Sequence, residues 1–139
     1  MQFLEAIQTC VLKKYADFNG RASRSEFWWY SLGYVVLSYA WSFIISMITG
    51  ASVMAGMDGN FHFSALQLLS YIPSLGLLLP TLAVGARRLH DIGKSGWWQL
   101  LNLICCGGLV LIYFWVQEGQ KGDNEYGPMP ADEPHRKYE

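Results

Sequence analysis

The stretch that decides the fold is residues 27–48, which read FWWYSLGYVVLSYAWSFIISMI. These 22 residues contain no Asp, Glu, Lys or Arg. As a helix they would extend about 33 Å, which is enough to cross a hydrocarbon core of about 30 Å. Ser23-Arg24-Ser25-Glu26 stands directly before them and fits the S-x-x-E capping box, so we expect the helix to begin here. The chain is therefore predicted to be an integral membrane protein.

Two further uncharged segments follow, residues 63–84 and residues 97–116. The first holds Pro73 and Pro80, and a proline inside a helix removes a backbone hydrogen bond, so we expect a bent span. The second has Gly107-Gly108 at its middle, which predicts a kink, a close helix contact or the tip of a re-entrant hairpin. The sequence thus predicts an all-α fold, a small polytopic bundle with three membrane-spanning helices.

The two ends of the chain complete this single domain. In residues 1–18 the apolar side chains recur at the spacing of an amphipathic helix. Such a helix either lies in the membrane interface or packs on the rest of the protein, and the sequence leaves both open. Residues 117–139 form a polar tail that is rich in Gly and Pro.

The composition excludes several classes of protein. The apolar fraction is 52% and the charged fraction only 15%, against roughly 25% charged residues in a typical soluble domain. A net charge of −1 gives no basic footprint for nucleic acid. Three cysteines, Cys10, Cys105 and Cys106, do not make a disulfide framework, and we interpret them as small apolar residues. His62, His90 and His135 are scattered, so neither a metal site nor a cofactor is expected.

The distribution of Lys and Arg predicts the orientation in the membrane, because cytoplasmic loops are enriched in both. Four precede the first span (Lys13, Lys14, Arg21 and Arg24), and three stand between the second and third (Arg87, Arg88 and Lys94). None lies in the loop 49–62. We therefore expect a cytoplasmic N-terminus. The tail would lie outside after three full spans and in the cytoplasm if the third segment is re-entrant.

The densest polar stretch is Arg87-Arg88-Leu89-His90-Asp91. One interpretation is a membrane-boundary anchor with a local ion pair, since residues three or four apart share a helix face. The other is a site for an anionic group such as a lipid phosphate, which the planar guanidinium fork suits well. Arg21, Arg24 and Lys94 lie on the same predicted side and would join that site.

Three functions remain open on the residues alone. The first is a non-enzymatic membrane protein that binds anionic lipid or an unidentified protein partner through this basic face. The second is a small homo-oligomeric transporter or channel, for which the small residues Gly33, Ser38, Ala40 and Ser42 would allow close helix packing. The third is an enzyme acting on a lipid headgroup with His90 and Asp91 as acid–base groups. Adjacent helical residues do not face each other, so no catalytic dyad is predicted.

Three stretches of the chain together resemble one known family. They are residues 18–28, FNGRASRSEFW, residues 87–98, RRLHDIGKSGWW, and residues 119–128, GQKGDNEYGP. Their order and spacing are similar to those of small bacterial inner-membrane proteins of the YhaH/YhaI type, which are grouped as a domain of unknown function. The resemblance covers about residues 10 to 130. It implies a bacterial cytoplasmic-membrane location, a compact helical fold and no assigned activity.

The residues that match the family pattern fall in all three stretches. They are Gly20, Arg21, Arg24, Glu26, Arg87, Arg88, His90, Asp91, Gly96, Trp97, Asn124 and Gly127. We expect Gly20, Ser23, Glu26, Gly96, Trp97, Asn124 and Gly127 to be structural. If all three stretches form one site, they must lie on one side of the membrane, and a re-entrant third segment would bring the tail there.

Overall fold

The computed structural model describes residues 2–55 and 68–132. Its helices are α1 (Phe3–Gln8), a π-helical turn η1 (Thr9–Lys13), α2 (Arg24–Ala55), α4 (Ile72–Gly76), α5 (Leu78–Asp91), a 3₁₀ helix η3 (Gly96–Leu103) and α6 (Gly107–Val116). The described residues contain no strand beyond one isolated bridge between Asn124 and Gly127. The predicted all-α class is confirmed.

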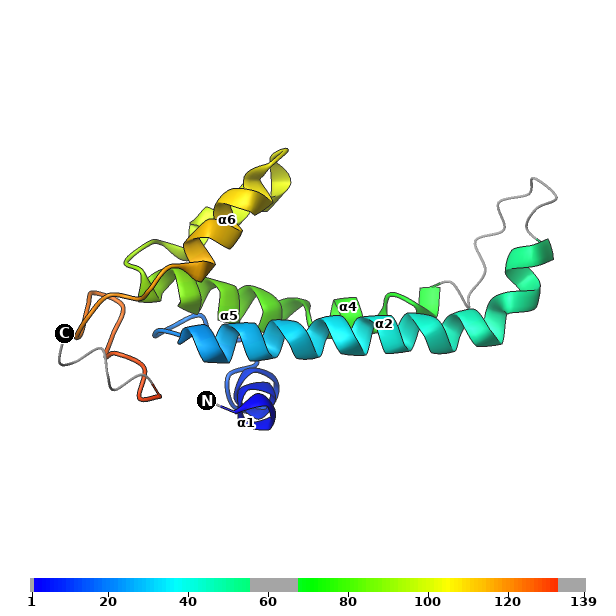
Figure 1. Ribbon diagram of the computed structural model, residues 1–139, viewed down its shortest axis with the longest axis horizontal. Coiled ribbons are helices and arrows are strands. Elements are labelled where there is room, and N and C mark those ends of the chain that lie inside the picture. Colours follow the sequence, from blue (N-terminus) through cyan, green and yellow to red (C-terminus); the bar gives the residue numbers. More distant parts are fainter. Residues whose placement is uncertain (1, 56–67, 133–139) are drawn as a thin grey trace.

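Helix α2 forms the long axis of the molecule (Figure 1). It begins at Arg24, three residues before the predicted span, because the Ser23 hydroxyl accepts a hydrogen bond from the Glu26 N–H at 3.1 Å and caps the first turn. Among the described residues, Arg24–Ile48 is the one helical stretch long and apolar enough to cross a membrane. Most of the large side chains in its middle, Val36, Tyr39 and Phe43 among them, are exposed. Three spanning helices are therefore not confirmed.

The second uncharged segment runs antiparallel to α2 as two short helices, α4 and α5 (Figure 1). The five residues 63–67 lie outside the described residues. The predicted bend is a break at Leu77, and each proline stands in the first turn of its helix, where a missing N–H costs nothing. Pro73 is the second residue of α4 and Pro80 the third of α5.

Each proline frees the carbonyl four residues before it, and each freed carbonyl has a donor from elsewhere in the chain. The indole Nε1 of Trp41 donates to the Leu69 carbonyl at 2.9 Å. The Tyr15 hydroxyl donates to the Gly76 carbonyl. A freed carbonyl in an apolar surrounding needs such a partner, so two aromatic side chains keep the broken segment stable.

The third uncharged segment is a helical hairpin, one of the alternatives predicted from Gly107-Gly108, in place of one continuous helix over residues 97–116. The chain runs away from α5 as η3, turns over residues 104–106 and returns toward α5 as α6 (Figure 1). Cys106 takes φ 67°, a left-handed conformation that few side chains adopt. A Cβ on Gly107 would lie 1.7 Å from the Leu101 carbonyl oxygen, so the two arms meet where only glycine fits.

The N-terminal helix packs across the first turns of α2. A Cβ on Gly33 would lie 2.4 Å from Cδ1 of Ile7, so this small residue admits α1 of its own chain. Ile7 and Val11 pack against the buried cluster of Cys10, Ala22, Phe27, Tyr30 and Val84. The amphipathic helix thus packs on α2, and its placement in the membrane interface and the association between copies stay predictions.

Candidate functional site

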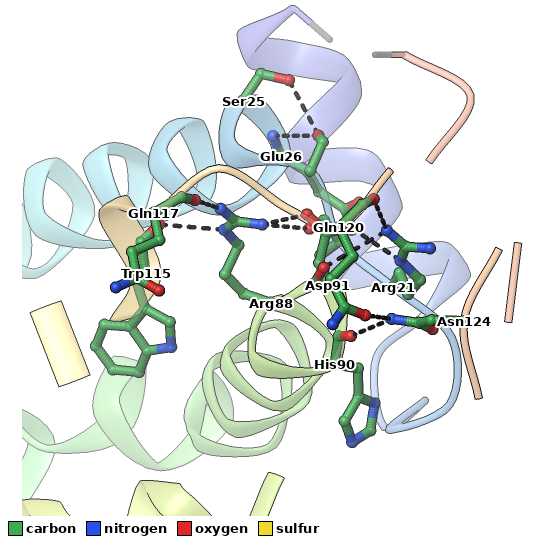
Figure 2. A network of polar contacts seen from close by, with 12 residues as sticks. Arg21, Ser25, Glu26, Arg88, His90, Asp91, Trp115, Gln117, Gln120 and Asn124 are labelled. Atoms are coloured by element: carbon green, nitrogen blue, oxygen red, sulfur yellow. Dashed lines mark hydrogen bonds and ion pairs between the residues drawn. The ribbon is translucent and has the colours of Figure 1, made fainter. Parts of the chain in front are cut away.

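The three motif stretches meet at one end of the molecule, where α2 begins and α5 ends (Figure 2). The polypeptide before α2 and the end of α5 are joined by a hydrogen bond from the Ala22 N–H to the Arg87 carbonyl at 3.0 Å. The tail joins them through the Gln120 N–H, which donates to the Asp91 carbonyl at 2.7 Å. The predicted convergence of the three stretches is therefore observed, and the hairpin is what returns the tail.

Asp91 is the centre of this arrangement. Its Oδ1 accepts a hydrogen bond from Arg21 Nε at 3.0 Å, and its Oδ2 accepts one from Arg88 Nη1. The side chains of all three residues are fully buried. One carboxylate thus bridges two guanidinium groups from different motif stretches, and these charge-assisted bonds are the strong kind.

Other donors of these two arginines go to backbone carbonyls in α6 and the tail. Arg21 donates to the carbonyls of Gln120 and Gly122. Arg88 donates to the carbonyl of Trp115 at 3.1 Å and to that of Gln117 (Figure 2). The two arginines therefore hold the end of α6 and the first part of the tail against α5.

Arg87 points to a different set of partners, because adjacent helical residues lie about 100° apart. Its Nη1 donates to Glu26 Oε1, and its Nη2 lies 3.9 Å from Cys10 Sγ. Cys10 donates in turn to Glu26 Oε1 at 3.6 Å. Burial, together with the neighbouring Glu26 charge, raises the pKa of the Cys10 thiol to about 12. Glu26 therefore does not return to the Ser23 N–H, and only the Ser23 half of the predicted capping box forms.

His90 and Asp91 do not form a dyad. The His90 ring uses Nδ1 toward the Gly20 carbonyl at 3.1 Å and stacks on Tyr126, with the ring centroids 4.1 Å apart. Burial lowers the pKa of His90. The His90 carbonyl accepts from Asn124 Nδ2 at 2.9 Å, which fixes the tail a second time. The geometry gives these residues a positioning role and no shared proton path.

The two remaining predicted site residues are half-buried and lie at the edge of this cluster. Lys94 places its Nζ 4.8 Å from the ring centroid of Phe114 and 5.3 Å from that of Trp98. Arg24 borders a shallow groove with Trp28 and Trp29. Cationic and indole side chains together are typical of the headgroup level of a membrane.

Apart from His90, the predicted ligand-binding residues fall into two groups, and Glu26, which was predicted to be structural, joins the first. We call the first the buried frame; it consists of Arg21, Glu26, Arg87, Arg88 and Asp91, all at most 5% exposed. We call Arg24 and Lys94, with their tryptophan neighbours, the cationic rim. An anionic ligand for these residues stays a prediction, and the frame arginines direct the donors described above to groups of their own chain.

The expected structural residues have local reasons for their identity. Gly20 and Gly127 have φ of 84° and 132°, which favour glycine. A Cβ on Gly96 would lie 2.9 Å from the Ala86 Cβ, so glycine lets the loop after α5 pack closely. Asn124 holds the tail as described, and Trp97 is exposed at the start of η3.

Sequence reasoning missed several members of the site. The acceptor carbonyls of Trp115, Gln117, Gln120 and Gly122 have no side-chain signature. Asp132 was also missed; its carboxylate accepts from the hydroxyls of Ser23 and Ser25, each at 2.6 Å. Among the described residues, no three His, Cys, Asp or Glu side chains gather as metal ligands would.

Comparison with known proteins gives a consistent grouping. A family model described as "Protein of unknown function (DUF805)" matches residues 15–128. The inner membrane protein YhaH of Escherichia coli (strain K12) is 38% identical over 125 residues, which cover 89% of this chain and 95% of YhaH. The inner membrane protein YhaI of the same strain is 36% identical over 121 residues, covering 86% of this chain and 91% of YhaI. No solved structure matches.

Proposed function

This chain belongs to the DUF805 family, and from that premise we propose that it is a non-enzymatic, multi-pass protein that binds anionic lipid headgroups at the cytoplasmic face of the membrane. The relatives are named inner membrane proteins, which supports a bacterial inner-membrane location. The proposed topology has a cytoplasmic N-terminus, α2 leading outward and the segment containing α4 and α5 leading back. The hairpin then enters from the cytoplasmic side and returns the tail to it.

The distribution of positive charge supports this topology. Basic residues at the start of α2 and at the end of α5 lie at one end of the molecule, and the tail is fastened there by Arg21 and Arg88. A full third span would carry the tail to the opposite side and separate these partners. The positive-inside rule assigns this end to the cytoplasm.

The observation that carries lipid binding is the position of the cationic rim. Arg24 borders a groove with Trp28 and Trp29, and the Lys94 ammonium lies over the rings of Trp98 and Phe114. Cationic side chains beside indole rings are typical of the level of the lipid headgroups. Arg24 and Lys94 would meet the phosphate of an anionic headgroup at this level.

Retention of lipid by the purified chain tests this proposal. We expect Arg24→Gln combined with Lys94→Gln to lower the affinity for phosphatidylglycerol in nanodiscs about tenfold or more, since each such residue contributes about 1 kcal/mol at an anionic surface. Native mass spectrometry of the bound lipids provides the measurement. Phosphatidylcholine nanodiscs show the background that does not depend on headgroup charge.

A matched variant separates the rim from surface charge in general. Lys13→Gln with Lys14→Gln removes the same charge from the end of η1. We expect this variant to retain phosphatidylglycerol nearly as the wild type does. Equal losses in the two variants, or no loss in the rim variant, would count against a specific headgroup site.

A further inference from the structure

We propose that the hairpin of η3 and α6 inserts into the cytoplasmic leaflet alone, and that this makes the protein a wedge that prefers membranes whose cytoplasmic leaflet is convex. The ligand of this surface is the acyl-chain region of that leaflet. The proposal goes beyond headgroup binding but rests on the topology proposed above.

The length of the hairpin is the first argument. The 10 residues of α6 extend about 15 Å, and the 8 residues of η3 about 16 Å at the longer rise of a 3₁₀ helix. Both arms therefore reach about half of a hydrocarbon core of about 30 Å. The equal lengths of the arms bring the chain back to the level from which it started.

The surface of the hairpin is the second argument. Residues 95–117 contain no charged side chain. Most of its large apolar side chains are exposed, with Leu103 at 84% and Leu109 at 69%, and Leu111 is buried. At the turn, the Ile104 N–H donates to Leu101 and the Gly107 N–H to Ile104, each at 3.0 Å, so these backbone groups are satisfied. An element with an apolar surface and paired backbone groups is stable in lipid.

The attachment of the hairpin keeps its tip away from the rest of the protein. Its base is fixed on α5, where the Gln99 side chain donates to the Leu82 carbonyl at 2.9 Å and Gly96 contacts Ala86. From that base the hairpin leans away from α2 (Figure 1). The tip therefore contacts whatever surrounds the protein, and in a membrane that is the acyl chains of one leaflet.

The cross-section of the protein is then larger in one leaflet than in the other. At the end of the buried frame, α1, α2, α5 and the hairpin lie together (Figure 1). At the opposite end, the described residues comprise only α2 and the region around α4. An element that fills one leaflet expands it, so binding is favoured where curvature has already opened the packing of that leaflet.

The test compares the density of the protein on vesicles of different diameter. The full chain carries Cys105→Ser, Cys106→Ser and a dye on a single cysteine placed at Asp123, while Cys10 stays because it is buried. It is reconstituted into phosphatidylcholine–phosphatidylglycerol vesicles. A membrane-impermeant quencher identifies molecules whose tail faces outward, and only these are counted. A second preparation with the dye at Asn19 reports the side of the segment before α2.

We expect tail-outward molecules to be enriched at least about twofold per unit area on the smallest vesicles. Leu103→Lys with Ile104→Lys should abolish the enrichment, because charges draw the exposed tip toward the headgroups. Both residues are exposed, so the change does not disturb the core. Ala16→Lys with Asn19→Lys adds the same charge before α2 and should keep the enrichment.

Each other outcome overturns part of the proposal. If the dyes at Asn19 and Asp123 are quenched from the same side but density is independent of vesicle size, the wedge is wrong and the proposed topology stands. If they are quenched from opposite sides, re-entry itself is wrong. Enrichment that survives in the tip variant assigns curvature preference to another element. A stable dimer that cross-links through position 103 assigns the hairpin surface to a second copy.

Discussion

The buried frame and the hairpin distribute charge and exposure in opposite ways. In the frame, Arg87, Arg88 and Asp91 are 0% exposed, whereas in the hairpin Leu103 and Trp97 are among the most exposed side chains of the molecule. A soluble domain has the reverse arrangement, because burying charge is costly and exposing apolar surface is unfavourable in water. The exposed apolar surface of the hairpin is explained if lipid surrounds it. The buried frame is stable only because its charged groups pair with one another and with backbone carbonyls.

The comparison shows which contacts determine the fold. If exposed side chains such as Val36 and Leu103 contact lipid both before and after the inserted chain folds, apolar burial contributes little to folding. The frame instead joins two stretches that are far apart in sequence through two carboxylates, and its arginines hold the tail through backbone carbonyls. Substitutions in the frame should therefore be far more costly than substitutions on the exposed apolar surface, and the predictions below test that expectation.

The largest effect is expected for Asp91→Ala, which leaves Arg21 and Arg88 buried without their common counter-charge. Removing one partner of a buried pair costs about 3–5 kcal/mol, and here two guanidinium groups lose theirs. Thermal unfolding in nanodiscs, followed by circular dichroism, should show a large loss of stability, and limited proteolysis should cleave the released tail. Val36→Ala on the exposed face serves as the control and should change stability by less than about 0.5 kcal/mol. Similar values for both variants would refute the contrast between the two regions.

A smaller effect is expected at the pair of Arg87 and Glu26, and a second substitution should reverse it. Glu26→Leu leaves Arg87 unpaired and should cost about 3 kcal/mol. Adding Arg87→Met should recover most of that loss, because well-packed apolar residues can replace a complete buried ion pair. A double-mutant cycle from the same unfolding measurements gives the coupling energy. No single arginine substitution should rescue Asp91→Ala in this way, since two guanidinium groups depend on it.

The sequence predicted where the helices and the charged cluster lie better than it predicted which residues contact one another. The uncharged run and Ser23 predicted the start of α2, because capping and hydropathy are local signals. The adjacent arginines appeared as one cluster, yet Arg87 and Arg88 point to different partners. The acceptors in the tail are carbonyls, which any residue could supply. Residues 97–116 are long enough for a span or a hairpin, and only the contact of Gly107 with Leu101 distinguishes the two.

That contact provides the third prediction. Gly107→Ala places a methyl group against the Leu101 carbonyl oxygen, so the hairpin must open, at a cost of about 1–3 kcal/mol. Gly108→Ala is the matched control, because its Cβ would meet Asn102 Oδ1 at 3.5 Å, an ordinary contact. Thermal unfolding of both variants gives the difference. Equal stability would show that the two arms do not meet at Gly107.

The smallest effect is a pH dependence at Cys10, whose thiol contacts Glu26 and Arg87 of the frame. Its pKa is raised from 9.0 to about 12 in the folded protein, chiefly by burial. Above pH 9 the unfolded chain loses this proton while the folded chain keeps it. Stability is therefore fully present below pH 9 and falls as the pH rises toward 12. At pH 10.5 the loss should be on the order of 1–2 kcal/mol.

Comparison with Cys10→Ala isolates this contribution from every other group that titrates in the same range. Near pH 7 the variant should be less stable than the wild type, because Glu26 loses a hydrogen-bond donor. As the pH rises from 9 to 11, the difference should shrink, since only the wild type must keep the thiol protonated. Val11→Ala removes an apolar contact from the same cluster, and its deficit should stay constant with pH. If both deficits stay constant, the thiol is not held neutral by burial, and the frame is more open to water than its exposed fractions indicate.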